Sequence, residues 1–198
     1  MLLAAAVNAE SSTKRQLHIF DAFSHIENYE NTSEFLQVRE EDVTQAFHTF
    51  DLLDSYVHFH VGLFSQTAPK WNPNELIAVL RIDGNFYDSY QDCMYYMYES
   101  VSVGGIVIFD DVLSHGPVLK FWLDFNKEQD LNVDLVNIDL HSAWFRKTKV
   151  TVLDWSYFRA PQDVNKQAET MKSRGCPEFV KKKVRNRCHS SWEDTSGE

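Results

Sequence analysis

Two short apolar runs that each lead into acidic residues constrain the fold of this chain most strongly. Residues 76–80 lead to Asp83, and residues 106–109 lead directly to Asp110 and Asp111. Both runs are continuous and rich in β-branched residues, which is typical of strands buried on both faces of a parallel sheet. We therefore expect two parallel strands whose carboxyl ends carry acids.

The segment between these strands predicts one crossover helix. Residues 87–101 contain neither Gly nor Pro and place apolar side chains three or four positions apart. Gly104 and Gly105 are expected to end this helix. The whole stretch is then a β-α-β unit, and in a right-handed unit both strand ends open on the edge of the sheet where ligands bind.

Asp83, Asp110 and Asp111 should converge at that edge. Carboxylates that lie close together repel one another, and a divalent cation with oxygen ligands is the simplest compensating charge. The alternative is that each Asp is an ordinary turn former or the N-cap of a following helix. Three acids at two strand ends favour the metal site.

Composition limits the partners of the protein. The 198 residues carry a net charge of −10, so the acidic body will not attract nucleic acid. Three cysteines without metal-ligand spacing favour a reducing compartment. No apolar run is long enough to span a membrane, and the start of the chain lacks the basic region of a signal peptide. These features predict a soluble, cytoplasmic protein without a membrane partner.

The N-terminal part predicts a strand, a helix and a second strand. The first strand, 17–20, is followed by Asp21, which could bind the hydroxyl groups of a ribose or be a plain loop residue. The helix covers residues 39–50, and the alternating pattern of residues 57–64 indicates an edge strand. On that strand, the side chains of His58 and His60 are expected to be solvated rather than metal-bound.

The C-terminal part predicts a second helix and an antiparallel hairpin. Residues 118–129 form the helix, which begins after Pro117, and residues 131–138 and 143–147 are strands too close in sequence for a crossover. The apolar periodicity fades from about residue 160. We expect a domain over residues 1–159 and a basic, solvated tail over residues 160–198.

These segments resemble the macrocin O-methyltransferase (TylF-like) family, in the family's order over about residues 2–148. The matching segments are HIFDAF at 18–23, VREEDV at 38–43, LLDSYVHFHVGLF at 52–64, LIAVLRIDGN at 76–85, YDS at 87–89, VGGIVIFDD at 103–111 and VNIDLHSAWFRK at 136–147. The resemblance implies a Rossmann-like class I methyltransferase fold, an α/β sheet that is mostly parallel and closes with a C-terminal antiparallel hairpin. It also implies S-adenosylmethionine and Mg²⁺ as cofactors.

The resemblance assigns roles to individual residues. Asp83, Asp110 and Asp111 look like the Mg²⁺ ligands, and Asp21 looks like the acid that binds the ribose of the cofactor. The family has a second Asp, regarded as the general base, where this chain has Asn85. Because an amide has no useful basicity near neutral pH, either His115 or water would have to accept the proton.

A second departure concerns the first central strand of the family and its glycine-rich cofactor turn. Both should precede Met1, and the chain contains no G-x-G motif. We therefore expect strands 17–20 and 76–82 to have unpaired edges. The protein should then be only marginally stable and self-associate as a homo-oligomer. It should also bind S-adenosylmethionine weakly.

The sequence thus predicts an O-methyltransferase that acts on a hydroxyl group of a sugar or another small-molecule natural product, and that is incomplete at its N-terminus. The alternative is a non-catalytic methyltransferase-like protein that retains the fold and the acids but acts by binding. A Mg²⁺-dependent phosphate enzyme is disfavoured, because the sequence has no loop to cradle a phosphate.

Overall fold

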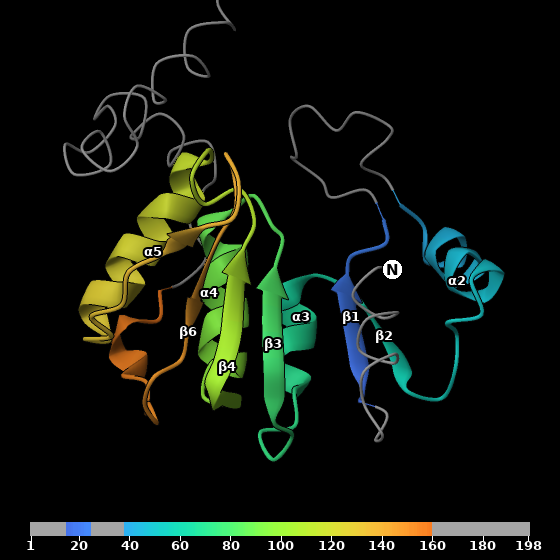
Figure 1. Cartoon of the computed structure of the whole chain (residues 1–198), viewed down its shortest axis with the longest axis horizontal. Helices are drawn as coiled ribbons and strands as arrows, with labels where there is room; N and C mark the ends of the chain where they lie inside the picture. The colour runs from blue at the N-terminus through green and yellow to red at the C-terminus, as the bar shows by residue number, and fades with distance from the viewer. Residues whose placement is uncertain (1–14, 25–37, 160–198) are drawn as a thin grey trace, which may run out of the picture. The chain divides into compact units, whose positions relative to one another are not determined.

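The computed structural model describes residues 15–24 and 38–159. The chain divides at Lys70 into two compact units, unit 1 over Met1–Lys70 and unit 2 over Trp71–Glu198. Each unit contains a pair of parallel strands (Figure 1). The single domain expected over residues 1–159 stays a prediction, and the expected tail over residues 160–198 lies outside the described residues.

Unit 1 is a short α/β unit. Strands β1 (Leu17–Asp21) and β2 (Val57–Val61) pair in parallel, and helix α2 (Glu40–Thr49) lies between them in sequence. Helix α2 begins with three acidic residues, which favourably meet the positive end of the helix dipole. It buries Phe47, whose ring meets Phe59 of β2 edge-on. After β2 the chain forms the short helix α3 (Phe64–Thr67) and the 3₁₀ turn η2 (Ala68–Lys70).

The histidines of β2 are not solvated as expected. His58 and His60 are both half-buried, and each ring stacks on His18 of β1, with centroids 4.8 Å and 5.2 Å apart. The Nδ1 atom of His18 lies 3.0 Å from Nε2 of His60. The expectation was wrong because the parallel register of β1 and β2 places these imidazoles side by side, which a single strand pattern does not reveal.

Unit 2 contains a four-stranded mixed sheet with the order β3-β4-β6-β5. Its elements are β3 (Ile77–Ile82), α4 (Tyr87–Met97), β4 (Val101–Phe109), α5 (Gly116–Glu128), β5 (Val136–Asn137), β6 (Ala143–Arg146) and η3 (Trp155–Tyr157). Strands β3 and β4 are parallel and flank α4, so the predicted β-α-β unit is confirmed. Strand β6 is antiparallel to β4 and to β5, which confirms the hairpin, although β5 has only two residues.

The glycine pair lies inside β4 and does not end the helix. Helix α4 ends at Met97, and Val101 is the first residue of β4. Ile77 of β3 pairs with Val101, but Val79 already pairs with Ile106, so residues 102–105 bulge out of the ladder. Gly104 has a φ of 88°, and a Cβ atom on Gly105 would lie 2.8 Å from the Ser102 carbonyl oxygen. Both positions therefore favour glycine.

Helices α4 and α5 cover one face of this sheet with aromatic side chains. Tyr90 of α4 packs edge-on against Phe109 of β4, and Trp122 of α5 packs against Phe145 of β6. Burial on both faces was expected for β3 and is wrong: Ile82 is buried, whereas Val79 is 39% exposed. Among the described residues, β1 is hydrogen-bonded to β2 alone and β3 to β4 alone. No helix in this part of the chain has the length and apolar character needed to cross a membrane.

A buried lysine closes the C-terminal end of α4. Lys147, which is only 2% exposed, donates from Nζ to the carbonyl oxygens of Tyr98 and Glu99, at 2.8 Å and 3.0 Å. The ammonium group also lies 4.7 Å from the centroid of the Tyr98 ring. Burial lowers the pKa of Lys147, and the negative charge of Glu99 partly offsets this effect. Lys147 thereby gives a charged donor to the two carbonyl groups that follow α4, of which that of Tyr98 also accepts the Val101 amide.

We expect Lys147→Met to lower the free energy of unfolding by about 2 kcal/mol, because it leaves two inward carbonyl groups without a charged donor. Lys149→Met is the matched control: Lys149 is exposed and bonds one carbonyl oxygen, that of Asp130, at 3.2 Å. Its loss should cost less than about 0.5 kcal/mol. Urea unfolding followed by circular dichroism measures both, and equal losses would contradict the role of Lys147.

Candidate functional site

The carboxyl ends of β3 and β4 are fixed to one another by backbone and side-chain hydrogen bonds. The Asp110 amide donates to the Ile82 carbonyl oxygen at 3.0 Å. The Tyr90 hydroxyl lies 3.1 Å from the Ile82 carbonyl oxygen and 2.5 Å from that of Asp110. Burial and the nearby negative charge of Asp83 raise the pKa of Tyr90, so the phenol keeps its proton as a donor. This edge is therefore held in a defined geometry.

Asp83 and Asp110, here called the acid pair, meet at this edge. The Arg81 Nη2 atom lies 2.8 Å from Oδ2 of Asp83 and 2.5 Å from Oδ2 of Asp110. Partial burial raises the pKa of the Asp83 carboxyl group; Arg81 works against this effect, and the neighbouring Asp110 adds to it. One guanidinium nitrogen thus stands between two carboxylates.

A serine from the hairpin positions Asp110. The Ser142 hydroxyl donates to Oδ1 of Asp110. Ser142 is itself fixed, because Oδ1 of Asp139 accepts the amides of His141 and Ser142 at 2.8 Å and 2.7 Å. The partners of the acid pair therefore come from two separate places in the chain, β3 and the turn before β6.

Asp111 makes other contacts. Its φ is 55°, a left-handed conformation that Asp tolerates better than most residues, and its carbonyl oxygen accepts the His115 amide at 2.7 Å. Its Oδ1 atom is 3.3 Å from the Ser114 hydroxyl. Within residues 15–24 and 38–159, no group of three His, Cys, Asp or Glu side chains is arranged to hold a metal ion. The acid pair suits a hard cation as two oxygen ligands, and Asp111 is not assembled with it as a third.

The remaining predicted site residues occupy separate positions. Asn85 is half-buried in the loop between Asp83 and α4, and His115 is exposed at the N-cap of α5. Asp21 is the last residue of β1 rather than the residue just after the strand, as was expected, and its Oδ1 atom accepts the Phe23 amide at 2.8 Å. This bond is the local turn that the plain-loop alternative describes, and it leaves a ribose-binding role untested.

Sequence reasoning missed three residues of the site: Arg81, Ser142 and Tyr90. Arg81 is two positions before Asp83, so alternation along β3 could have placed both on one side of the strand. Tyr90 lies on the predicted sheet-facing stripe of the helix, where its apolar ring concealed the role of its hydroxyl group. For Ser142 no local signal exists.

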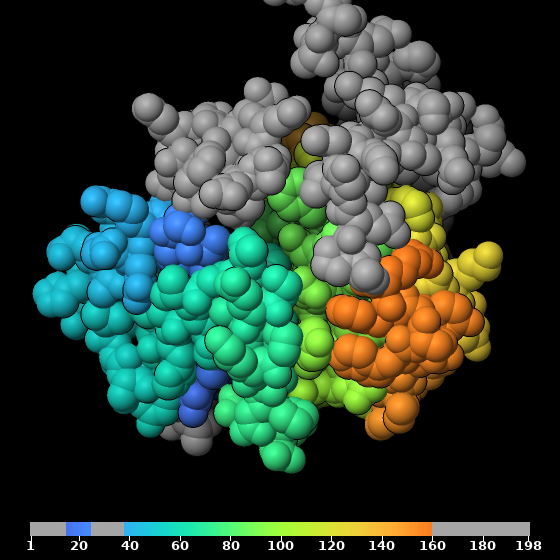
Figure 2. Space-filling view, turned by 180° about the vertical axis from the view of Figure 1, so that it is seen from behind, coloured from blue at the N-terminus to red at the C-terminus, as the bar shows by residue number. Residues whose placement is uncertain are grey.

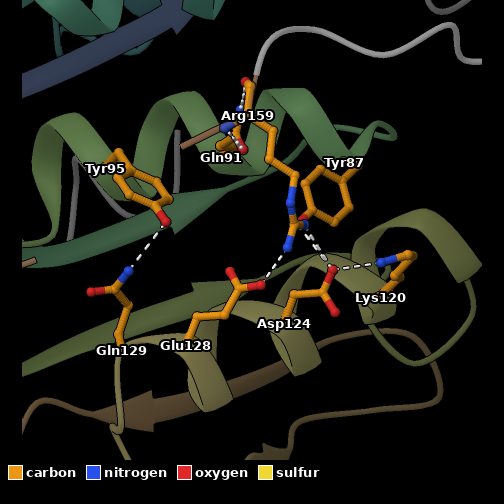
Figure 3. A network of polar contacts seen from close by, with 8 residues as sticks. All are labelled: Tyr87, Gln91, Tyr95, Lys120, Asp124, Glu128, Gln129 and Arg159. Atoms are coloured by element: carbon orange, nitrogen blue, oxygen red, sulfur yellow. Dashed lines mark hydrogen bonds and ion pairs between the residues drawn. The ribbon is translucent and has the colours of Figure 1, made fainter. Parts of the chain in front are cut away.

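A polar network joins α4, α5 and the segment that follows β6 (Figure 3). Oδ2 of Asp124 accepts the Tyr87 hydroxyl at 3.0 Å, and it also lies 2.5 Å from Lys120 Nζ and 3.0 Å from Arg159 Nη1. Arg159 further bonds the Tyr87 hydroxyl and Glu128.

Burial works against ionisation of Asp124, but the bonds from Lys120 and Arg159 keep its pKa below the usual value. Tyr87 is the first residue of α4, so the network holds the end of the loop that begins at Asp83.

The chain around Arg159 is held by side-chain clamps. The Gln91 amide group bonds both the N–H and the C=O of Arg159, and that of Gln129 does the same for Asp154. Trp155 and Phe158 pack edge-on against Tyr95. Figure 2 shows this segment, in orange, lying against the yellow-green surface of the two helices.

The mixed sheet of parallel strands that closes with a C-terminal antiparallel hairpin is similar to the sheet of Rossmann-like O-methyltransferases. The structure of the O-methyltransferase NovP matches with a TM-score of 0.69 and 30% identity, covering 75% of this chain and 66% of that chain. The calicheamicin methyltransferase CalS11 shares the fold, with a TM-score of 0.53 and 17% identity over 73% of this chain and 65% of that chain.

The model of the macrocin-O-methyltransferase (TylF) family matches residues 1–147, and the chain belongs to this family. It is 37% identical over 114 residues to demethyldecarbamoylnovobiocin O-methyltransferase of Streptomyces niveus, covering 58% of this chain and 43% of that protein. It is 30% identical over 132 residues to mycinamicin III 3''-O-methyltransferase of Micromonospora griseorubida, covering 66% and 50%. The chain therefore spans about half the length of these curated relatives.

We expect Arg159→Met to lower the free energy of unfolding by about 1 to 2 kcal/mol, because Asp124, Glu128 and Tyr87 lose a shared donor. Lys120→Met is the matched control, since Lys120 forms a half-exposed pair with the same Asp124 oxygen and should contribute about 0.5 kcal/mol. Urea unfolding gives both values. A larger loss for Lys120→Met would show that Arg159 does not organise this network.

Proposed function

We propose that the protein transfers a methyl group from S-adenosylmethionine to a hydroxyl group of a sugar or another small-molecule natural product. Membership of the TylF family supports the reaction, and the names of the two curated relatives support an acceptor of this class. The observation that carries the proposal is the acid pair at the carboxyl edge of β3 and β4, where open α/β sheets bind their ligands.

Asp83 and Asp110 are the residues proposed to hold Mg²⁺, and Asp111 would become a third ligand only by turning its carboxylate toward them. When bound, Mg²⁺ would lower the pKa of the acceptor hydroxyl group and orient it for methyl transfer. The hydrogen bonds from Tyr90 and Ser142 support this assignment, because they fix the backbone and the carboxylate of Asp110. Their contribution is positional: they hold ligand atoms where the reaction needs them.

Proton removal falls to His115 or to water. Asn85 occupies the position of the family's general base, and an amide cannot accept the proton. His115 follows Asp111 by four residues and is exposed, so its ring is accessible to an acceptor molecule. Asp21, at the end of β1, is proposed to bind the ribose of the cofactor.

The second candidate is a non-catalytic methyltransferase-like protein. One observation favours it: Asn85 lacks the basicity expected at its position. Such a protein would keep the acid pair as a binding feature. The two candidates differ in whether any methyl group is transferred.

The test is a methyl-transfer assay with S-adenosylmethionine labelled in its methyl group, Mg²⁺ and a panel of glycosides that carry vicinal hydroxyl groups. Labelled glycoside from the purified protein would establish the activity. Equilibrium dialysis of the same protein with the labelled cofactor is run in parallel. We expect Asp21→Asn to weaken cofactor binding, because it removes the carboxylate proposed to bind the ribose. Cofactor binding without any labelled product would favour the non-catalytic candidate.

We expect Asp83→Asn to abolish methyl transfer, because it removes a proposed cation ligand, and Asn85→Asp to raise the rate by restoring a base worth roughly 10² to 10⁴ in rate. His115→Ala is the discriminating variant. An unchanged rate in Asn85→Asp, together with a reduced rate in His115→Ala, would assign the base to His115. Initial rates over a range of pH values measure all three.

A further inference from the structure

Arg81 occupies the position that a cation would take at the acid pair. We propose that Arg81 is the resident counter-cation of Asp83 and Asp110, and that a divalent cation binds there only after the guanidinium group has withdrawn. The inference rests on the proposed function for the identity of the site and adds a regulatory residue to it. Arg81 would act through the two carboxylates that it contacts, and it is therefore a positioning residue.

The geometry makes the two cations mutually exclusive. A single atom, Arg81 Nη2, lies 2.8 Å from one carboxylate oxygen and 2.5 Å from the other. Oxygen ligands lie about 2.0 to 2.6 Å from Mg²⁺ or Ca²⁺, so an ion bound between the same two oxygens would overlap the guanidinium nitrogen. Even a displaced ion within a few ångströms would meet a like charge, which is unfavourable in a partly buried site.

The side chains of Arg81 and Asp110 differ in how exposed they are and in how firmly other residues hold them. The Arg81 side chain is 47% exposed and lies on the same exposed side of β3 as Val79. The Asp110 side chain is 23% exposed, and the Ser142 hydroxyl binds its other oxygen. The Asp83 side chain is 50% exposed, like Arg81, so exchange is achieved by movement of Arg81 with adjustment of Asp83, while Asp110 stays in place.

The arrangement sets a threshold for cation binding. Without a divalent ion, Arg81 compensates the charge of the acid pair and keeps both carboxylates together. A divalent ion must then replace favourable contacts between Arg81 and two carboxylates, so its apparent affinity is reduced by the fraction of molecules in which Arg81 has withdrawn.

The test is a titration of the whole chain with Mn²⁺, with free Mn²⁺ measured by electron paramagnetic resonance. We expect Arg81→Met to bind Mn²⁺ at least tenfold more tightly than the natural protein. Arg146→Met is the matched control, because Arg146 lies on the same sheet but donates to the Gly104 carbonyl oxygen. It should leave the Mn²⁺ affinity unchanged. Adding Asp110→Asn to Arg81→Met should abolish the gain.

The proposal would be overturned if Arg81→Met folds and binds Mn²⁺ no more tightly than the natural protein does. It would also be overturned if neither protein binds Mn²⁺. If Arg81→Met does not fold, Arg81→Lys replaces it and should bind Mn²⁺ more tightly than the natural protein, since a single ammonium group is more easily displaced. The Mn²⁺ titration and the methyl-transfer assay test the two proposals separately. If Arg81→Met gains Mn²⁺ affinity but no methyl group is transferred, the proposed function is refuted and the role of Arg81 is retained.

Discussion

The repulsion between carboxylates at neighbouring parallel strand ends is the constraint on which this site depends. Parallel pairing of β3 and β4 brings Asp83 and Asp110 to one edge, and two negative charges there require a compensating positive charge. In this structure Arg81 provides it, while Tyr90 and Ser142 fix the strand ends and one carboxylate. The same feature that could recruit a metal ion therefore also explains why an arginine lies beside it.

Helix α4 connects this edge to the rest of unit 2, and charged side chains from distant parts of the chain hold both of its ends. At its start, Tyr87 joins Asp124 of α5 and Arg159. At its end, Lys147 binds the carbonyl oxygens that follow the last turn. Because the loop from Asp83 leads directly into α4, the packing of the helix and the position of the site are coupled.

Family membership describes the protein as a whole, whereas its chemistry depends on individual side chains. The match over residues 1–147 places the chain in the macrocin-O-methyltransferase (TylF) family. The proposed metal site and general base depend on single residues, and Asn85 is an amide at the position expected for the base. An amide has nearly the shape of a carboxylate but lacks its basicity, so Asn85 would be compatible with the fold without acting as a base.

The sequence by itself determined the β-α-β unit, the hairpin and the acids at the strand ends, because these follow from local periodicity and from where apolar runs stop. Tertiary structure decided the rest. Gly104 and Gly105 were expected to end a helix and instead form a bulge, because the ladder with β3 resumes only at Ile106. The stacking of His18 on His58 and the contact of Ser142 with Asp110 join residues 40 and 32 positions apart. The directions of the side chains at the two strand ends decide whether the three acids form one metal site or whether two of them bind an arginine. No local sequence pattern encodes these directions.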